Sequence, residues 1–193
     1  MRTKRILVGL TAGIAIAQLL LVLLSWLFSA MMVDGVRSLL SSEGIRWFFG
    51  NFVSMLATPQ LVWLFLLAMA AGAFWHCGLR YPLHTYREKT ALRLVFVLLL
   101  LYLAAIATLT IAPHAVLLSA TGRLCFSPFS RSVIPIVAFG ILLISAVYGR
   151  MSGRFTSAAD VFDAMSAGIS HCAPVFIVYV VLMQFYESIL FVF

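Results

Sequence analysis

Residues 6–32 of this chain of 193 residues read ILVGLTAGIAIAQLLLVLLSWLFSAMM. This stretch carries no acidic, basic or histidine side chain. A helix needs about 20 apolar residues to cross the hydrocarbon core of a bilayer, so this stretch predicts a transmembrane helix. It is also longer than the ~7–15-residue core of a signal peptide, and bulky Phe28 stands where cleavage near Ala30 would need a small residue. We therefore predict that this helix is not cleaved.

Further apolar runs extend the pattern at residues 61–78, 92–112, 133–149 and 173–193. Hydrophobic residues make up 64% of the chain and charged residues only 10%, with a mean hydropathy of +1.11. These values exclude a soluble globular domain and a disordered chain. The runs are continuous, whereas a membrane barrel needs alternating segments. The sequence predicts an all-α integral membrane protein with about five transmembrane helices in a single domain, residues 1–193.

The basic residues lie between the apolar runs and predict the orientation. The side of the N-terminus carries nine: Arg2, Lys4, Arg5, Arg80, Arg87, Lys89, Arg93, Arg150 and Arg154. The other side carries four: Arg37, Arg46, Arg123 and Arg131. Because Lys and Arg are enriched in cytoplasmic loops, we expect a cytoplasmic N-terminus and an external C-terminus in a bacterial inner membrane. The net charge of +7 then indicates contact of the basic residues with lipid headgroups rather than binding of nucleic acid.

Two segments are predicted to be helical without spanning the membrane. Residues 42–56 follow Ser41 and Ser42, both good N-caps, and place Glu43 in the first turn. Their apolar side chains recur at helical spacing, which predicts an amphipathic helix at the membrane surface, either a connector or a re-entrant, gating element. Residues 158–170 form a second amphipathic pattern, with Ser157 and Asp160 in a weak capping-box arrangement.

Each amphipathic segment lies between two predicted spans, and the two resulting units have opposite orientation. Residues 6–78 form one such unit, and residues 133–193 form the other. This order is typical of the inverted repeats of secondary transporters. Residue identity between the halves is negligible, so a remnant of an inverted repeat is an interpretation based on topology alone.

The polar side chains near the middle of the spans are few, and two are glutamines. Gln18 lies near the middle of the first run and Gln184 near the middle of the last. Such amides commonly form hydrogen bonds between helices, and the alternative is contact with a polar substrate. These two residues are the sequence's weak candidates for a substrate site.

Two further patterns have both a structural and a functional interpretation. Gly9, Gly13 and Ala17 form a ridge of small residues, which predicts close packing against another helix within the chain or across a dimer. The pair His-Cys occurs as His76, Cys77 and as His171, Cys172. Two His and two Cys match the ligands of tetrahedral zinc. Adjacent helical residues point about 100° apart, however, so buried cysteines and helix-end histidines are favoured and no metal is expected.

No motif of an enzyme is present. The sequence lacks a nucleophile elbow, a phosphate-binding loop and a metalloprotease helix. We expect a protein without catalytic residues or a bound cofactor, whose partners are the lipid bilayer and either further copies of itself or another membrane protein.

Several stretches together resemble the p-aminobenzoyl-glutamate transporter (AbgT) family. They are SLLSSEGIRWFFGNFVSMLATPQLVWLFLLAMAAGAFWHCGL (38–79), YREKTALR (86–93), SPFSRSVIPIV (127–137) and AVYGRMSGRFTSAADVFDAMSAGISHCAPVFIVYVVLMQF (146–185). The resemblance implies a dimeric inner-membrane secondary transporter, coupled to H⁺ or Na⁺, for aminobenzoyl-glutamate or sulfonamide-type molecules. The family's re-entrant hairpins, with most of its substrate-binding residues, have no counterpart here. The resemblance therefore implies a short form that is incomplete as a stand-alone transporter, or a non-transporting accessory subunit or remnant.

Overall fold

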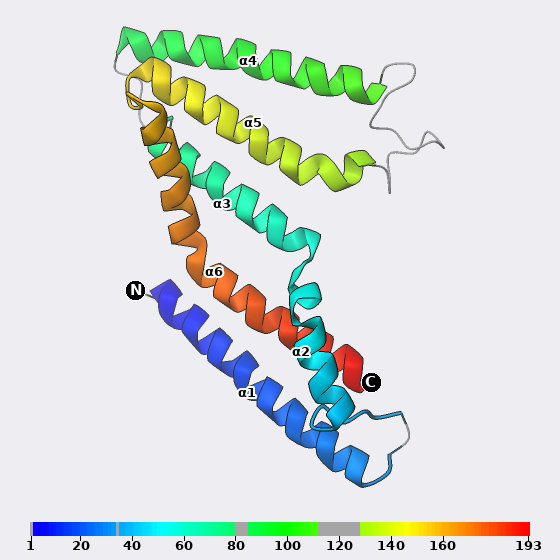
Figure 1. Cartoon of the computed structure of the whole chain (residues 1–193). Helices are drawn as coiled ribbons and strands as arrows, with labels where there is room; N and C mark the ends of the chain where they lie inside the picture. Colours follow the sequence, from blue (N-terminus) through cyan, green and yellow to red (C-terminus); the bar gives the residue numbers. More distant parts are fainter. Residues whose placement is uncertain (1, 34, 80–84, 112–127) are drawn as a thin grey trace. The chain divides into compact units, whose positions relative to one another are not determined.

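The structure, a computed structural model, describes residues 2–33, 35–79, 85–111 and 128–193. Arg80, Ala112 and Arg123, which the predictions above include, lie outside these residues. Within the described part, all regular secondary structure is helical (Figure 1). Five of its helices are long and apolar enough to cross a membrane, and the shorter α2 is not among them. The predicted class, an all-α integral membrane protein, is confirmed.

The helices follow the predicted order along the chain. Their bounds are α1 Arg2–Ala30, α2 Ser42–Leu56, α3 Pro59–Cys77, α4 Tyr86–Ile111, α5 Pro128–Ser152 and α6 Ala158–Val192. The segment expected at 42–56 has the same bounds as α2. The Ser41 hydroxyl accepts a hydrogen bond from the Gly44 N–H at 3.0 Å, as its position before the helix predicts. The largest extension is at the start of α4, which begins at Tyr86 instead of residue 92.

The prediction of two separate helices at 158–170 and 173–193 is wrong. Both segments belong to α6, a single helix of 35 residues that includes Pro174. Proline inside a helix removes one backbone hydrogen bond and kinks the helix, but it need not end it. No glycine follows residue 170 to provide a C-cap, and Ala173 continues the helix into the apolar run. The second amphipathic segment is thus the first part of α6 and not an independent interfacial helix.

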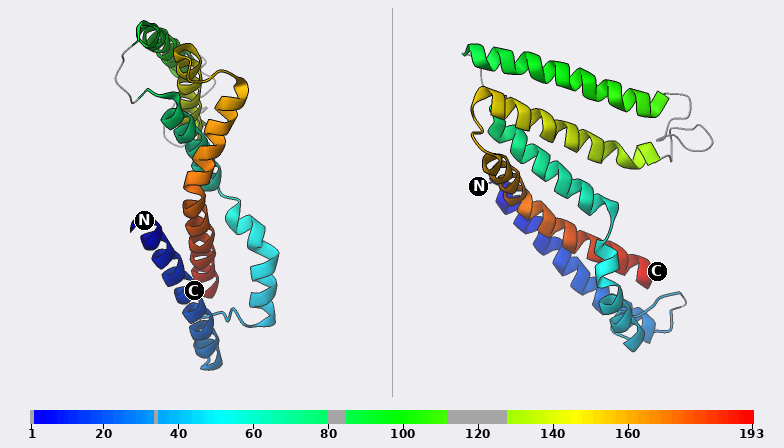
Figure 2. Two further views of the ribbon diagram at one scale, coloured as in Figure 1. Left: turned by 90° about the vertical axis from the view of Figure 1, so that its left-hand side faces the viewer. Right: turned by 45° about the horizontal axis from the view of Figure 1, so that its top comes forward.

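The described chain divides into two compact units. Unit 1 comprises Met1–Val62 and Cys172–Phe193, and it holds α1, α2 and the C-terminal part of α6. In this unit α1 and α6 run side by side in the same direction (Figures 1 and 2). Leu39, Phe191 and Val192 are its buried apolar cluster. The Trp47 ring of α2 stacks on Phe191, with 4.2 Å between ring centroids, and so holds α2 against the end of α6.

Unit 2 comprises Trp63–His171 and holds most of α3, all of α4 and α5, and the first part of α6. Helices α4 and α5 lie side by side in opposite directions (Figure 2). The Tyr102 hydroxyl of α4 donates to the Ile136 carbonyl of α5 at 2.7 Å. Nearer the start of α4, Ala91 and Val95 lie in one buried cluster with Tyr148 of α5. This antiparallel pair forms much of the core of the unit.

A tight turn connects α5 to α6. Gly153 has a φ of +84°, a left-handed conformation that favours glycine. The Phe155 N–H donates to the Gly149 carbonyl at 2.9 Å, and the Phe155 ring lies directly on the Gly149 backbone. The Asp160 carboxylate then accepts from the backbone N–H groups of Thr156 and Ser157 at 2.6 and 3.1 Å. The predicted cap of Ser157 and Asp160 is therefore formed.

Candidate functional site

Unit 1 contains a polar pair between two spans. The Gln18 amide nitrogen of α1 donates to the Ser188 hydroxyl of α6 at 2.9 Å. Ser188 is fully buried, and Gln18 is half-buried. The Gln18 Oε1 atom is buried and accepts no hydrogen bond from the described residues. An unpaired amide oxygen is costly away from water, so this atom is available to a hydrogen-bond donor that enters the site.

The sequence indicates Gln18 but not its hydrogen-bond partner Ser188. Gln184, the second candidate, is half-buried and lies one turn before Ser188, and therefore on the same face of α6. No hydrogen bond to the Gln184 side chain is recorded within the described part of the chain. Serine is common in membrane helices, so the position of Ser188 one turn after Gln184 was the only available signal. The structure thus brings Gln18 to Ser188.

Buried hydroxyls fix the backbone around this pair. The Leu39 N–H donates to the Ser25 hydroxyl of α1 at 3.2 Å, and the Arg37 N–H donates to the Val192 carbonyl at 3.0 Å. The segment before α2 is thereby attached to both α1 and α6. Where α2 ends, the hydroxyls of Thr58 and Tyr179 share a short hydrogen bond. These contacts hold α1 and α6 in register at the level of Gln18 and Ser188.

The two His-Cys pairs are placed differently. His76 and Cys77 lie at the end of α3, as the structural interpretation expects, whereas His171 and Cys172 lie within α6 and not at a helix end. His76 Nδ1 lies 2.9 Å from the Gly72 carbonyl, and His171 Nδ1 lies 3.1 Å from the Ala167 carbonyl, each one turn earlier on its own helix. Cys77 is fully buried in the core of unit 2, and Cys172 is half-buried in unit 1. Among the described residues, no three His, Cys, Asp or Glu side chains are grouped to hold a metal ion.

The small-residue ridge of α1 faces open space in the described chain. A Cβ built at Gly9 or Gly13 would meet no atom within 4 Å, and Ala17 is half-buried. A close contact within the chain is therefore not formed at these glycines. The predicted contact across a dimer stays a prediction.

Close packing by small residues occurs instead between α3 and α6 in unit 2. A Cβ at Gly72 would lie 2.3 Å from the Ala164 carbonyl oxygen, and one at Gly168 would lie 2.2 Å from the Ala68 carbonyl oxygen. The backbones touch at these points because no side chain separates them. Ala68 and Gly72 on α3, and Ala164 and Gly168 on α6, have the same small-xxx-small spacing as the ridge on α1. Spacing alone therefore does not indicate which small residues are in close contact.

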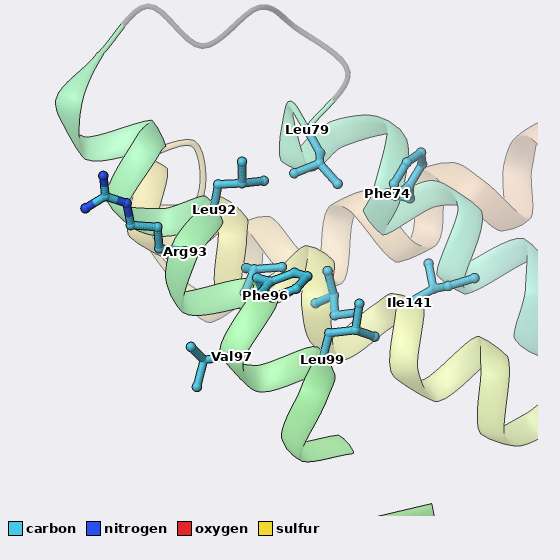
Figure 3. Close-up of a pocket in the computed structure, with 10 residues that line it drawn as sticks. Phe74, Leu79, Leu92, Arg93, Phe96, Val97, Leu99 and Ile141 are labelled. Carbon is cyan, nitrogen blue, oxygen red and sulfur yellow. The ribbon is translucent and has the colours of Figure 1, made fainter. Parts of the chain in front are cut away.

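Unit 2 also contains an apolar groove of about 720 Å³, which we call the α3–α5 groove (Figure 3). It is lined by Phe74, Leu79, Leu92, Arg93, Val95, Phe96, Val97, Leu99, Ile141 and Ile144. Leu79 and Phe74, at the end of α3, face Leu92 and Phe96 of α4 across it (Figure 3). Arg93 is its one charged lining residue, and its guanidinium points away from the apolar side chains (Figure 3).

These observations define the class of protein. It is a multi-pass helical membrane protein whose described spans carry mainly apolar side chains. Comparison with protein-family models matches residues 80–192 to the AbgT putative transporter family. The match covers more than half of the chain, and the chain belongs to this family. No curated protein and no solved structure matches it.

The family match confirms the resemblance seen in the sequence from YREKTALR onward. It covers α4, α5 and α6, whereas residues 38–79, which also resemble the family, lie outside it. Membership of a transporter family favours transport over catalysis. It assigns no substrate to Gln18, Gln184 or any other residue.

Proposed function

We propose that the chain acts in secondary transport across the bacterial inner membrane, with p-aminobenzoyl-glutamate or sulfonamide-type molecules as substrates and H⁺ or Na⁺ as the coupling ion. The observation that carries the proposal is the family match over residues 80–192, which includes three of the five long apolar helices. The buried, unpaired Gln18 Oε1 provides a polar position at which a substrate N–H or a hydrated ion would bind.

The chain would transport as part of an assembly. The ridge of Gly9, Gly13 and Ala17 lies on an otherwise exposed apolar helix, and small residues at this spacing let two membrane helices approach closely. A second copy of α1 is the partner that this face fits best. Another membrane protein is the alternative partner.

Flux measurements on the purified full chain in proteoliposomes test the proposal. Uptake of labelled aminobenzoyl-glutamate should exceed that of empty liposomes and should disappear when an ionophore removes the H⁺ or Na⁺ gradient. Gln18→Leu should reduce this flux at least tenfold if Oε1 contacts the transported species. A purely structural hydrogen bond between helices contributes only ~0.6 kcal/mol, so in that case Gln18→Leu would change stability slightly and leave flux intact.

A non-transporting accessory role is the second candidate, and the exposed apolar face of α1 favours it. In this role the chain would bind a separate membrane transporter through helix–helix contacts. Flux equal to that of empty liposomes, together with co-purification of another membrane protein that Gly13→Leu abolishes, would support this candidate over autonomous transport.

A further inference from the structure

We propose that the α3–α5 groove binds one anionic phospholipid, with an acyl chain between the helices and the phosphate at Arg93. This inference concerns a lipid site and does not depend on whether the chain transports. It stands on the shape of the groove, the position of the charge and the character of the surrounding surface.

The shape and lining suit an acyl chain. The volume of about 720 Å³ falls within the ~300–1,000 Å³ typical of ligand sites. All lining residues other than Arg93 are aliphatic or phenylalanine, and they come from α3, α4 and α5 and from Leu79, just after α3. Each of these helices qualifies as a membrane span, so lipid tails are the medium around the groove.

The charge lies where a phosphate would be. Arg93 is seven residues beyond Tyr86, the first residue of α4, or about 10 Å along the helix axis. A long arginine side chain at this depth extends its guanidinium toward the headgroups while its stem contacts apolar surface. The guanidinium is exposed, and no hydrogen bond or ion pair joins it to another described residue. It can therefore bind a phosphate through paired N–H donors.

The same helix end carries further positive charge. Arg87 and Lys89 are exposed within the first turns of α4, on the side that the basic residues predict to be cytoplasmic. Anionic lipids concentrate in the cytoplasmic leaflet, and basic pockets between spans on that side bind their headgroups. A phosphatidylglycerol-type lipid thus complements both the groove and its rim.

The lining side chains argue against another helix as the occupant. Close helix packing in this protein uses small residues, as at Gly72 and Gly168, where backbones touch. The groove instead presents long side chains such as Phe96 and Leu99, which leave an irregular gap. A flexible acyl chain fills such a gap, whereas a straight helix would be held away from it.

Native mass spectrometry of the full chain in detergent, titrated with phosphatidylglycerol or phosphatidylcholine of identical acyl chains, tests the proposal. Phosphatidylglycerol should bind tighter by roughly fivefold, as expected for one cation near the headgroup. Arg93→Gln should remove this preference and Arg93→Lys should keep part of it. Arg46→Gln, which removes an exposed positive charge from α2 in unit 1, away from the groove, should change it less than twofold. Leu99→Trp should fill the groove and weaken both lipids.

Unit 1 has a second, smaller groove, lined by Lys4 among mainly apolar residues, which could hold a further lipid. Arg93→Gln should lower the number of retained phosphatidylglycerols by one rather than to zero. Equal binding of both lipids by the unmodified protein would overturn the proposal. So would equal losses in Arg93→Gln and Arg46→Gln, or displacement of the lipid by aminobenzoyl-glutamate, which would make the groove a substrate site.

Discussion

At the scale of single residues, two glycines determine how closely α3 and α6 approach. The atoms that a new Cβ would meet at Gly72 and Gly168 are backbone atoms of the facing helix, so no side chain can move aside. Lipid tails are as apolar as the helix surfaces, and association in the membrane depends on close packing rather than on a hydrophobic driving force. The contact between these glycines is therefore central to the stability of unit 2.

Gly168→Ala should destabilise the protein by about 1–3 kcal/mol, because the added methyl group forces the backbones apart. The measurement is the free energy of unfolding of the full chain in detergent micelles. Gly50→Ala is the matched control, since a Cβ at Gly50 in α2 would meet nothing within 4 Å. Alanine there should be neutral or stabilising by up to ~1 kcal/mol. Equal stability of the two variants would contradict the assignment of a close contact.

At the scale of elements, α2 shows how local signals define a helix. Its start is set by the Ser41 hydroxyl, which accepts from the Gly44 N–H, and by Glu43 in the first turn. The Ala57 N–H bonds to the Val53 carbonyl at its end, and Pro59 then begins α3. The predicted and observed bounds agree because these signals act within a few residues.

Ser41→Ala should weaken the first turn of α2 by about 0.5–2 kcal/mol, the usual cost of removing an N-cap. Hydrogen exchange at the Gly44 amide should accelerate correspondingly. Ser42→Ala provides the control, because the exposed Ser42 hydroxyl forms no recorded hydrogen bond in the described chain. Faster exchange at the Gly44 amide in Ser42→Ala than in Ser41→Ala would show that Ser42, and not Ser41, caps the helix.

At the scale of the whole molecule, the order of apolar and basic segments predicts the arrangement in the membrane. Five helices are long and apolar enough to span, an odd number that would place the chain ends on opposite sides. Within unit 1, α1 and the C-terminal part of α6 run in the same direction, which agrees with that number. The excess of Lys and Arg beside the N-terminus predicts that this side is cytoplasmic, by the positive-inside rule.

Reporter fusions at each end of the chain should therefore give a cytoplasmic signal at the N-terminus and an external signal at the C-terminus. Fusions after residues 57 and 155, which lie between predicted spans, supply internal checks and should be external and cytoplasmic respectively. A cytoplasmic C-terminus would rule out five spans.

The features that sequence predicted well are those with short-range causes. The length of an apolar run is fixed by the thickness of the bilayer, and every backbone group in lipid must bond within its own helix. The predicted break at residues 171–172 was wrong, because α6 continues as one helix from the amphipathic segment through Pro174 into the apolar run. Continuation depends on neighbouring helices that compensate the lost hydrogen bond, and the sequence does not reveal them.

The amino-acid sequence alone is enough to predict an all-helical membrane protein that resembles the AbgT family, since apolar length, capping residues and family patterns are local. The packing of the helices, by contrast, shows that small residues are in close contact at Gly72 and Gly168 and not at Gly9 and Gly13. It likewise joined Gln18 to Ser188 and opened a groove beside Arg93. Which faces meet depends on how residues far apart in the sequence pack together, and no local pattern encodes that choice.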